Sequence, residues 1–139
     1  MPTIFTAIIE GSVPAHIIYR DENVIAFLDI NPRSKGHTLV VPIREVQYLR
    51  ELSSNESSAL FDVVHQIVSK MTSILSCDDY SIIINDGPAA GQEIPHVHAH
   101  IIPRWLNDSG YAGTSSIPII SPAPENEEFQ LLVEKLNFS

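Results

Sequence analysis

The sequence predicts an α+β domain with a mostly antiparallel five-stranded sheet and one long helix. The first observation is a series of short apolar segments joined by connections of hairpin length, which is typical of antiparallel strands. The second is a single long stretch with helical periodicity that interrupts this series. The third is the size: 139 residues, of which 44% are hydrophobic and 18% charged, correspond to one globular domain with a substantial core.

The N-terminal part of the chain predicts a short helix followed by three strands. Apolar residues at helical spacing stop at Gly11, where the helix is expected to end. Turn residues at 21–23 and a loop at 31–36 then separate three apolar segments, and the last of these ends with Pro42, which cannot donate to a neighbouring strand. The expected elements are a helix that contains Ile4, Phe5, Ile8 and Ile9, and strands at 17–20, 24–29 and 37–42.

The longest expected helix follows Ser53. Ser53 and Glu56 have the spacing of a capping box, in which each side chain bonds to the backbone N–H group of the other residue. Downstream, apolar side chains recur every three or four residues and form one stripe. Packing against a sheet explains this stripe without any chemical role. It consists of Ala59, Leu60, Val63, Val64, Ile67, Val68, Met71, Ile74 and Leu75.

The C-terminal half predicts two further strands and a final helix. The two strands are separated by a loop of small residues at 86–92. Beyond Arg104 the chain becomes rich in Ser, Pro and Gly. The last helix is expected to have acidic residues in its first turn, as the helix dipole favours. The expected elements are strands at 80–85 and 96–103 and a helix at 125–136.

The composition argues against several classes of function. A formal net charge of −9 disfavours a general nucleic-acid-binding protein, which needs an excess of Lys and Arg. Cys77 is the single cysteine, so an intramolecular disulfide is impossible, as is usual in a reducing compartment. The N-terminus lacks the pattern of a signal peptide, and no apolar run approaches the length of a membrane span. We therefore expect a soluble, cytoplasmic protein without nucleic-acid or membrane partners.

The most informative segment is His96-Val97-His98-Ala99-His100, which contains three of the six histidines. Because side chains alternate faces along a strand, a strand here places all three imidazoles on one face and the apolar residues on the other. Imidazoles can act as nucleophile, acid, base or metal ligand. The preceding loop contains Gly87 and Gly91, and its backbone N–H groups can converge on an anion. The alternative interpretation is a solvent-facing polar strip, although such strips usually consist of Lys, Thr, Glu and Ser.

These segments resemble the signature of the histidine-triad family over about residues 3–104. The resemblance implies the fold of that family, with a catalytic domain at 1–104 and a C-terminal tail at 105–139 that belongs to the same domain. It implies hydrolysis or transfer at the α-phosphate of a purine nucleotide or dinucleotide, without a metal or another cofactor, and it implies a homodimer. The motifs that carry it are Ile4-Phe5, Ile8-Ile9-Glu10-Gly11, Ala26-Phe27-Leu28-Asp29-Ile30, Gly36-His37, Asn85 to Gln92 and His96 to Arg104.

The resemblance gives each histidine of the signature a separate role. His98 matches the nucleophile, which forms a covalent nucleotidyl-histidine that water then cleaves. Its other nitrogen is expected to donate to a backbone carbonyl next to His96, which fixes the tautomer. His100 and His37 match positions that face the phosphate and the leaving group, where they donate hydrogen bonds as charge develops.

The resemblance also implies a nucleotide-binding site. Asp29 matches the acceptor for the ribose hydroxyls, and four residues of the 85–93 segment match contacts to the phosphate. Each position also has a structural interpretation, since the apolar residues could form core and Asp29 before Asn31-Pro32 could belong to a turn. The phosphate-side residues are Asn85, Gly91, Gln92 and Glu93, and the apolar slot for the base is formed by Phe5, Ile8, Phe27 and Ile30.

Two departures from the family pattern are visible. Many members begin with Cys-x-x-Cys and carry a further histidine after the third strand, and these residues hold a structural zinc ion. Here the corresponding positions are Thr3 to Thr6 and Arg44-Glu45, so a zinc site of that type is not expected. The second departure is Glu93, where the phosphoramidase branch usually has Ser. Glu93 either points away from the site or has a raised pKa and acts as an acid.

Two other functions compete with the nucleotide hydrolase. One is a metal-dependent hydrolase in which the histidine strand supplies the ligands, although no carboxylate lies beside it in the sequence. The other is a non-catalytic module that binds a nucleotide or a partner. Activity in the presence of a chelator distinguishes the first alternative, and binding without turnover distinguishes the second.

Overall fold

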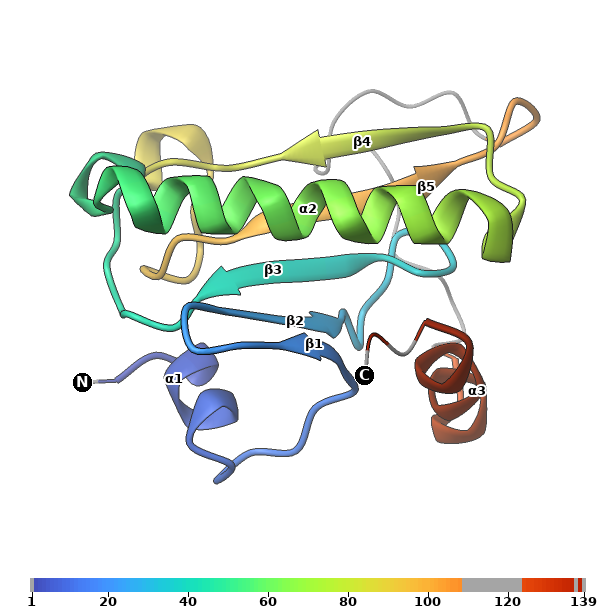
Figure 1. Cartoon of the computed structure of the whole chain (residues 1–139), viewed down its shortest axis with the longest axis horizontal. Coiled ribbons are helices and arrows are strands. Elements are labelled where there is room, and N and C mark those ends of the chain that lie inside the picture. Colours follow the sequence, from blue (N-terminus) through green and yellow to red (C-terminus); the bar gives the residue numbers. More distant parts are fainter. Residues whose placement is uncertain (1, 109–123, 137, 139) are drawn as a thin grey trace.

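The computed structural model describes residues 2–108, 124–136 and 138, and it confirms the α+β class. Five strands form one sheet in the order β1-β2-β3-β5-β4, and all neighbouring strands are antiparallel (Figure 1). β5, which carries the last histidine of the signature, therefore lies inside the sheet between β3 and β4. The strands are β1 (Ile17–Arg20), β2 (Val24–Leu28), β3 (Thr38–Pro42), β4 (Asp79–Ile83) and β5 (Ala99–Arg104).

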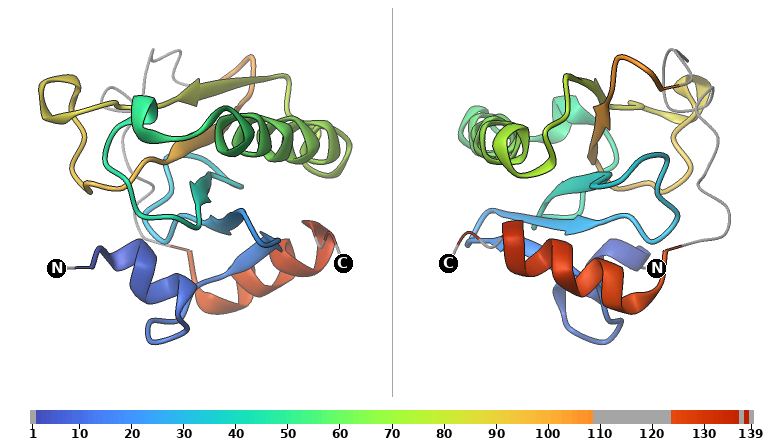
Figure 2. Two further views of the ribbon diagram at one scale, coloured as in Figure 1. Left: turned by 60° about the vertical axis from the view of Figure 1, so that its left-hand side comes forward. Right: turned by 90° about the vertical axis from the view of Figure 1, so that its right-hand side faces the viewer.

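The two faces of the sheet are covered by different helices. α2 (Ser54–Leu75) and α3 (Asn126–Leu136) pack on one face, and the short helix α1 (Ile4–Ile9) lies on the other (Figure 2). We call these the α2 face and the α1 face. Along β5, Ala99 and Ile101 belong to the core of the α2 face. His100 alternates with them and therefore points to the α1 face.

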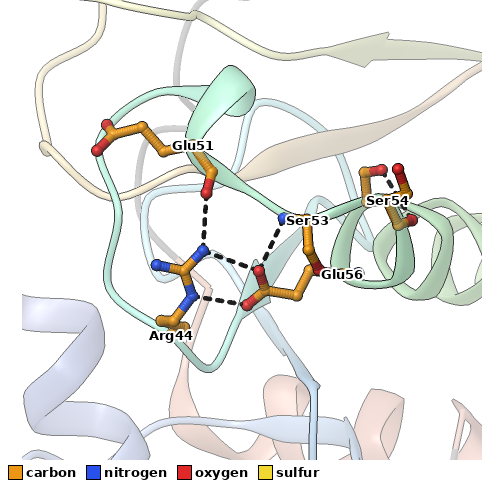
Figure 3. Close-up of polar contacts among 6 residues, drawn as sticks. Arg44, Glu51, Ser53, Ser54 and Glu56 are labelled. Atoms are coloured by element: carbon orange, nitrogen blue, oxygen red, sulfur yellow. Dashed lines mark hydrogen bonds and ion pairs between the residues drawn. The ribbon is translucent and has the colours of Figure 1, made fainter.

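The start of α2 confirms the capping box. The Ser53 side chain accepts a hydrogen bond from the Glu56 backbone N–H at 3.1 Å, and the Glu56 carboxylate accepts one from the Ser53 N–H at 2.8 Å. The Arg44 guanidinium binds both oxygens of Glu56 and also donates to the Glu51 carbonyl (Figure 3). These contacts join the end of β3 to the first turn of α2.

The end of α2 packs closely against the loop that leads into β3. Gly36 has φ +89°, a conformation that glycine adopts without a steric penalty. A Cβ atom on Gly36 would lie 2.6 Å from Cδ1 of Leu75, so a larger residue would require the end of the Leu75 side chain to move. The loop therefore approaches α2 closely at the residue before His37.

The largest difference from the predicted elements concerns the histidine segment. The strand expected at 96–103 begins only at Ala99 and continues to Arg104, so His96 and His98 lie before it. The reason is that Val97 donates its N–H to the Val46 carbonyl at 2.8 Å, beyond the end of β3, and that the His96 side chain is held by atoms outside the ladder. The strand expected at 17–20 has those bounds, and the boundaries of the other three strands differ from the expected ones by at most two residues, which is usual at frayed ends.

The connections contain two short 3₁₀ helices, Leu49–Glu51 and Pro88–Ala90. The second of these lies in the expected loop at 86–92. The final helix is confirmed as α3, and its Phe129, Leu132 and Leu136 join the core of the α2 face. The Ser/Pro/Gly-rich part at 109–123 lies outside the described residues. Of the helices that the structure describes, none has the length and hydropathy needed to cross a bilayer.

Candidate active site

His98 is oriented by the backbone of the segment that precedes β5. Its Nδ1 lies 2.8 Å from the His96 carbonyl oxygen. A carbonyl only accepts, so Nδ1 carries the proton and Nε2 carries the lone pair. Among the described residues, Nε2 has no hydrogen-bond partner, and the side chain is 7% exposed. The contact expected for His98 is therefore present, and Nε2 presents a neutral lone pair.

His96 is completely buried and is held at both ring nitrogens. Nε2 lies 2.9 Å from the Pro42 carbonyl oxygen, and Nδ1 lies 2.9 Å from the Thr3 hydroxyl. Because Nε2 must donate to the carbonyl, Nδ1 accepts from Thr3. The ring of Phe5 lies edge-on to His96 and to His98, with centroids 5.7 Å and 4.9 Å apart, so both imidazoles point to the α1 face as expected.

His37 and His100 form a directed chain of hydrogen bonds. The backbone N–H of Arg33 donates to Nδ1 of His37 at 3.0 Å, so Nε2 of His37 carries the proton. Nε2 lies 3.0 Å from Nδ1 of His100 and donates to it. His100 therefore carries its proton on Nε2, and its ring centroid lies 5.0 Å from that of His98. We expected both side chains to face the phosphate. His37 is only 1% exposed and donates to His100, and it also lines a cavity together with Asp29.

The four imidazoles are neutral at pH 7. Burial lowers the pKa of His37 to about 3 and that of His100 to about 4. Burial also lowers the pKa of His96 and of His98. The contact of 3.6 Å between Nε2 of His37 and the Asp29 carboxylate is therefore not an ion pair. Neutral rings are required here because both the lone pair of His98 and the acceptor nitrogen of His100 are used.

Asp29 follows β2 and faces the same site. One carboxylate oxygen accepts the Asn31 N–H at 2.8 Å, which confirms the turn interpretation. The other oxygen is the one that lies near His37. Burial raises the pKa of the Asp29 carboxyl. Asp29 thus closes the turn with one oxygen and offers the second to the site, so its two interpretations do not exclude each other.

Three of the four residues expected to form the base slot lie in one cluster. Phe5, Ile8 and Phe27 are buried in one cluster on the α1 face, with the rings of Phe5 and Phe27 in edge contact at 5.7 Å. Ile30 is 60% exposed and lies outside this cluster. Three of the four side chains therefore also form core, and Ile30 has an open surface that a base can cover.

The loop expected on the phosphate side is held mainly by Gln92. Its side-chain oxygen accepts the Gly87 N–H at 3.1 Å, and its amide nitrogen donates to the Gln47 carbonyl at 2.9 Å. Gln92 therefore shapes the loop with its side chain. Asn85 is half-buried, whereas Gly91 and Glu93 are exposed. Burial lowers the pKa of His98, and the negative charge of Glu93 partly offsets this effect.

Comparison with known proteins identifies the family. A sequence profile of the HIT domain matches residues 10–106, which is more than half of the chain. The chain belongs to the HIT family. An uncharacterised HIT-like protein of Methanocaldococcus jannaschii is 48% identical over 105 residues, 76% of this chain and 81% of the relative. An adenosine 5'-monophosphoramidase of Schizosaccharomyces pombe is 38% identical over 138 residues, 99% of this chain and 97% of the relative.

A solved structure supports the same assignment. The histidine triad nucleotide-binding protein of Sulfolobus tokodaii superimposes with a TM-score of 0.82 at 30% sequence identity, covering 96% of this chain and 88% of that chain. The described sheet of this HIT protein thus has the family architecture that the resemblance predicted.

Asp29, His37 and His100 of this HIT protein are arranged for hydrogen bonding rather than for binding a metal ion. Atoms of Asp29, His37 and His100 lie within 4.8 Å of one another. A metal ion on Nε2 of His37 requires a lone pair there, and the neutral ring would then carry its proton on Nδ1. Nδ1 already faces the N–H of Arg33, so two donors would oppose each other. The tautomer of His37 therefore disfavours a metal ion held by Asp29, His37 and His100. The alternative in which the histidine strand supplies the ligands concerns other atoms and stays a prediction.

The sequence analysis did not find two features of the HIT site. The first is Arg33, whose backbone N–H orients His37 and whose charge also lowers the pKa of His37 and His100. The second is a cavity of about 550 Å³ between α3 and the loop that contains Asp29 and His37. Both depend on segments that are distant in the sequence, so no local pattern indicates them. Outside the site, His16 stacks on Phe129 of α3 with centroids 4.6 Å apart.

Proposed function

We propose that this HIT protein hydrolyses nucleotides at the α-phosphate through a covalent nucleotidyl-histidine on Nε2 of His98. The observation that carries the proposal is the direction of three hydrogen bonds. The His96 carbonyl holds the proton of His98 on Nδ1, so Nε2 is a nucleophile. The chain from Arg33 through His37 leaves a donor, Nε2–H, on His100. Nucleophile and donor thus lie side by side on the α1 face.

The reaction proceeds in two displacements. In the first, the lone pair on Nε2 of His98 forms a bond to phosphorus while the bond to the leaving group breaks, and the leaving group keeps the electron pair and takes up a proton from solvent. The His96 carbonyl stabilises the positive charge that the ring acquires, and the N–H of His100 stabilises charge on the phosphoryl oxygens. In the second, water attacks phosphorus, the bond to Nε2 breaks, and one water proton passes to solvent.

The substrate class follows from the groups around this pair. The free carboxylate oxygen of Asp29 suits neighbouring ribose hydroxyls, which donate hydrogen bonds to it. The apolar cluster with Phe5 and the exposed Ile30 suit a flat base. The Schizosaccharomyces pombe relative is named for a phosphoramidate of adenosine 5'-monophosphate. We therefore propose purine nucleoside phosphoramidates as substrates, with dinucleoside polyphosphates as the second class.

Hydrolysis assays test this proposal directly. Wild-type protein, His98→Ala and the control His65→Ala are incubated with adenosine 5'-phosphoramidate and with diadenosine polyphosphates. His65 is exposed on α2, so its replacement is expected to leave the rate unchanged. His98→Ala is expected to lower kcat by about six orders of magnitude, as loss of a covalent nucleophile does in other enzymes. Absence of hydrolysis of both classes by wild-type protein contradicts the proposal.

We also propose a homodimer in the cytoplasm. β4 is the outer strand of the sheet, and its Ile82 is 48% exposed, which suits pairing with a second copy of the chain. Light scattering measures the mass in solution, and Ile82→Lys is expected to shift it from dimer to monomer. A monomeric wild-type protein contradicts the dimer, and fractionation of cells tests the location.

A further inference from the structure

We propose that Thr3, supported by Glu45, is a positioning residue that fixes His96 and, through the His96 carbonyl, the nucleophile His98. This inference rests on the proposed function of His98. Thr3, Thr6, Glu45 and His96 form one hydrogen-bonded group, which we call the Thr3 brace. It joins the N-terminal end of α1 to the segment after β3 and to the residue that orients the nucleophile.

The Thr3 hydroxyl has a defined direction. Thr3 is the N-cap of α1, and its Oγ1 accepts the backbone N–H of Thr6 at 3.3 Å. The same oxygen lies 2.9 Å from Nδ1 of His96. Because Nε2 of His96 donates to the Pro42 carbonyl, Nδ1 is an acceptor, and the Thr3 hydroxyl must donate to it. The Pro42 carbonyl therefore sets the tautomer of His96, and the Thr3 hydroxyl supplies the donor that Nδ1 then requires.

Glu45 holds Thr3 in this position from the other side. One carboxylate oxygen accepts the backbone N–H of Thr3 at 2.8 Å and the Thr6 hydroxyl at 2.6 Å. The hydrogen bond from Thr6 lowers the pKa of the Glu45 carboxyl, so it is an anion at neutral pH and accepts both bonds. Glu45 is exposed, whereas the Thr3 side chain is mostly buried. We therefore assign the larger effect to Thr3.

A single residue, His96, connects the Thr3 brace to His98. His96 is held between Thr3 and Pro42, so its ring and backbone have a single position. Its carbonyl oxygen accepts Nδ1–H of His98 and sets the direction of Nε2. If the Thr3 hydroxyl is lost, Nδ1 of His96 becomes a buried acceptor without a donor, and the segment is expected to shift to satisfy it. A small displacement of a reacting nitrogen is enough to lower a rate.

The same positions hold a zinc ion in many members of the family. Here Thr3 and Thr6 have replaced the thiolates, the Glu45 oxygen already accepts two hydrogen bonds, and Nδ1 of His96 is occupied by a hydroxyl proton. This group does not fit zinc, which prefers thiolate and imidazole ligands. The Thr3 brace connects the same segments by hydrogen bonds alone.

Three substitutions test the brace. Thr3→Val removes the hydroxyl at constant shape, Thr3→Ser restores it, and Glu56→Gln removes a nearby carboxylate that bonds to Arg44 and Ser53 and does not touch the brace. We expect Thr3→Val to lower kcat about tenfold with KM changed less than about twofold, since the residue orients the nucleophile without contacting substrate. Thr3→Ser and Glu56→Gln are expected to keep the wild-type kcat.

The second measurement does not depend on turnover. Long-range ¹H–¹⁵N NMR spectra of ¹⁵N-histidine-labelled protein report which ring nitrogen carries the proton. His98 is expected to be protonated on Nδ1 in wild-type protein and in Thr3→Ser, and to become a mixture of tautomers in Thr3→Val. If Thr3→Val does not fold, Glu45→Ala replaces it, with an expected threefold loss of kcat, about a third of the effect of Thr3.

The outcomes separate the two proposals. Unchanged kcat and unchanged tautomers in Thr3→Val contradict the brace, even if wild-type protein is active. Equal loss of kcat in Thr3→Val and Thr3→Ser also contradicts it, because the hydroxyl is then not the cause. If wild-type protein is inactive, the proposed function is contradicted instead. The Thr3 brace is then tested only by the NMR measurement of the tautomers of His96 and His98.

Discussion

The two faces of the sheet are built by different physical means. The α2 face is closed by aliphatic side chains of α2, α3 and the strands, which pack without directional bonds. The α1 face buries a smaller apolar cluster next to four imidazoles, and those imidazoles are held by hydrogen bonds with fixed donors and acceptors. Van der Waals packing tolerates small shifts, whereas a directed hydrogen bond fixes which ring nitrogen carries the lone pair. The α2 face therefore supplies stability, and the α1 face orients the imidazoles of the proposed reaction.

The largest expected effect comes from a substitution that disrupts the core of the α2 face only. Ile67 is fully buried in α2, and Ile67→Ala removes core volume there. We expect the free energy of unfolding to fall by about 2–5 kcal/mol, as for other buried large-to-small substitutions. Activity per folded molecule should stay at the wild-type level. Urea titration and active-site-normalised kcat check both statements, and a large loss of kcat in fully folded Ile67→Ala would show that the two faces are not separable.

The next largest effect comes from a substitution that interrupts the chain of hydrogen bonds on the α1 face. His37→Phe keeps a ring but removes the donor to His100, which then has no partner to fix its tautomer. We expect kcat to fall about 10- to 100-fold, as when residues that orient catalytic groups are lost. His16→Phe is the matched control, because His16 stacks on Phe129 and lies outside this chain of hydrogen bonds. Equal kcat values for the two variants would contradict the role of His37.

A smaller effect concerns pH. The folded protein keeps His37 and His100 neutral far below their ordinary pKa of 6.5, because burial disfavours the charged ring. Between pH 6.5 and 5 the unfolded chain therefore binds protons that the folded chain does not bind, so stability falls as the pH falls. Each such ring contributes a slope of up to about 1.4 kcal/mol per pH unit. Urea titrations at several pH values measure the slope, which His37→Phe should reduce.

The smallest effect distinguishes the two hypotheses for Glu93. Its charge raises the pKa of His98, and it is exposed beside the site. Glu93→Gln is therefore expected to leave kcat near the wild-type value and to move the acid limb of kcat/KM slightly to lower pH. Rate measurements between pH 4 and 8 check this. Loss of kcat with disappearance of a basic limb would favour Glu93 as a proton donor.

The sequence was sufficient for the parts of the fold that depend on local patterns. The stripe of α2 and the capping box at Ser53 predicted the long helix, and alternation predicted that His96, His98 and His100 share a face. The strand boundary failed because a distant carbonyl, that of Val46, pairs with Val97 before the ladder begins.

The roles within the site needed the three-dimensional structure. His37 was expected at the phosphate, and only the structure shows that it accepts from the N–H of Arg33 and donates to His100. The bond between Thr3 and His96 joins residues 93 positions apart, and no local pattern contains it. Contacts between distant segments decide which nitrogen carries a proton, and the residue types alone leave that open.

Trapping the covalent intermediate tests the central claim most directly. Wild-type protein and His98→Ala are mixed with adenosine 5'-phosphoramidate, quenched within milliseconds in alkaline denaturant, and analysed by intact mass and peptide mapping. We expect wild-type protein to carry one adenylyl group on His98, and we expect no adduct on His98→Ala. A chiral α-phosphorus should keep its configuration, because two displacements restore it. Turnover without an adduct and with inverted configuration would contradict the account, since water would then attack the nucleotide directly.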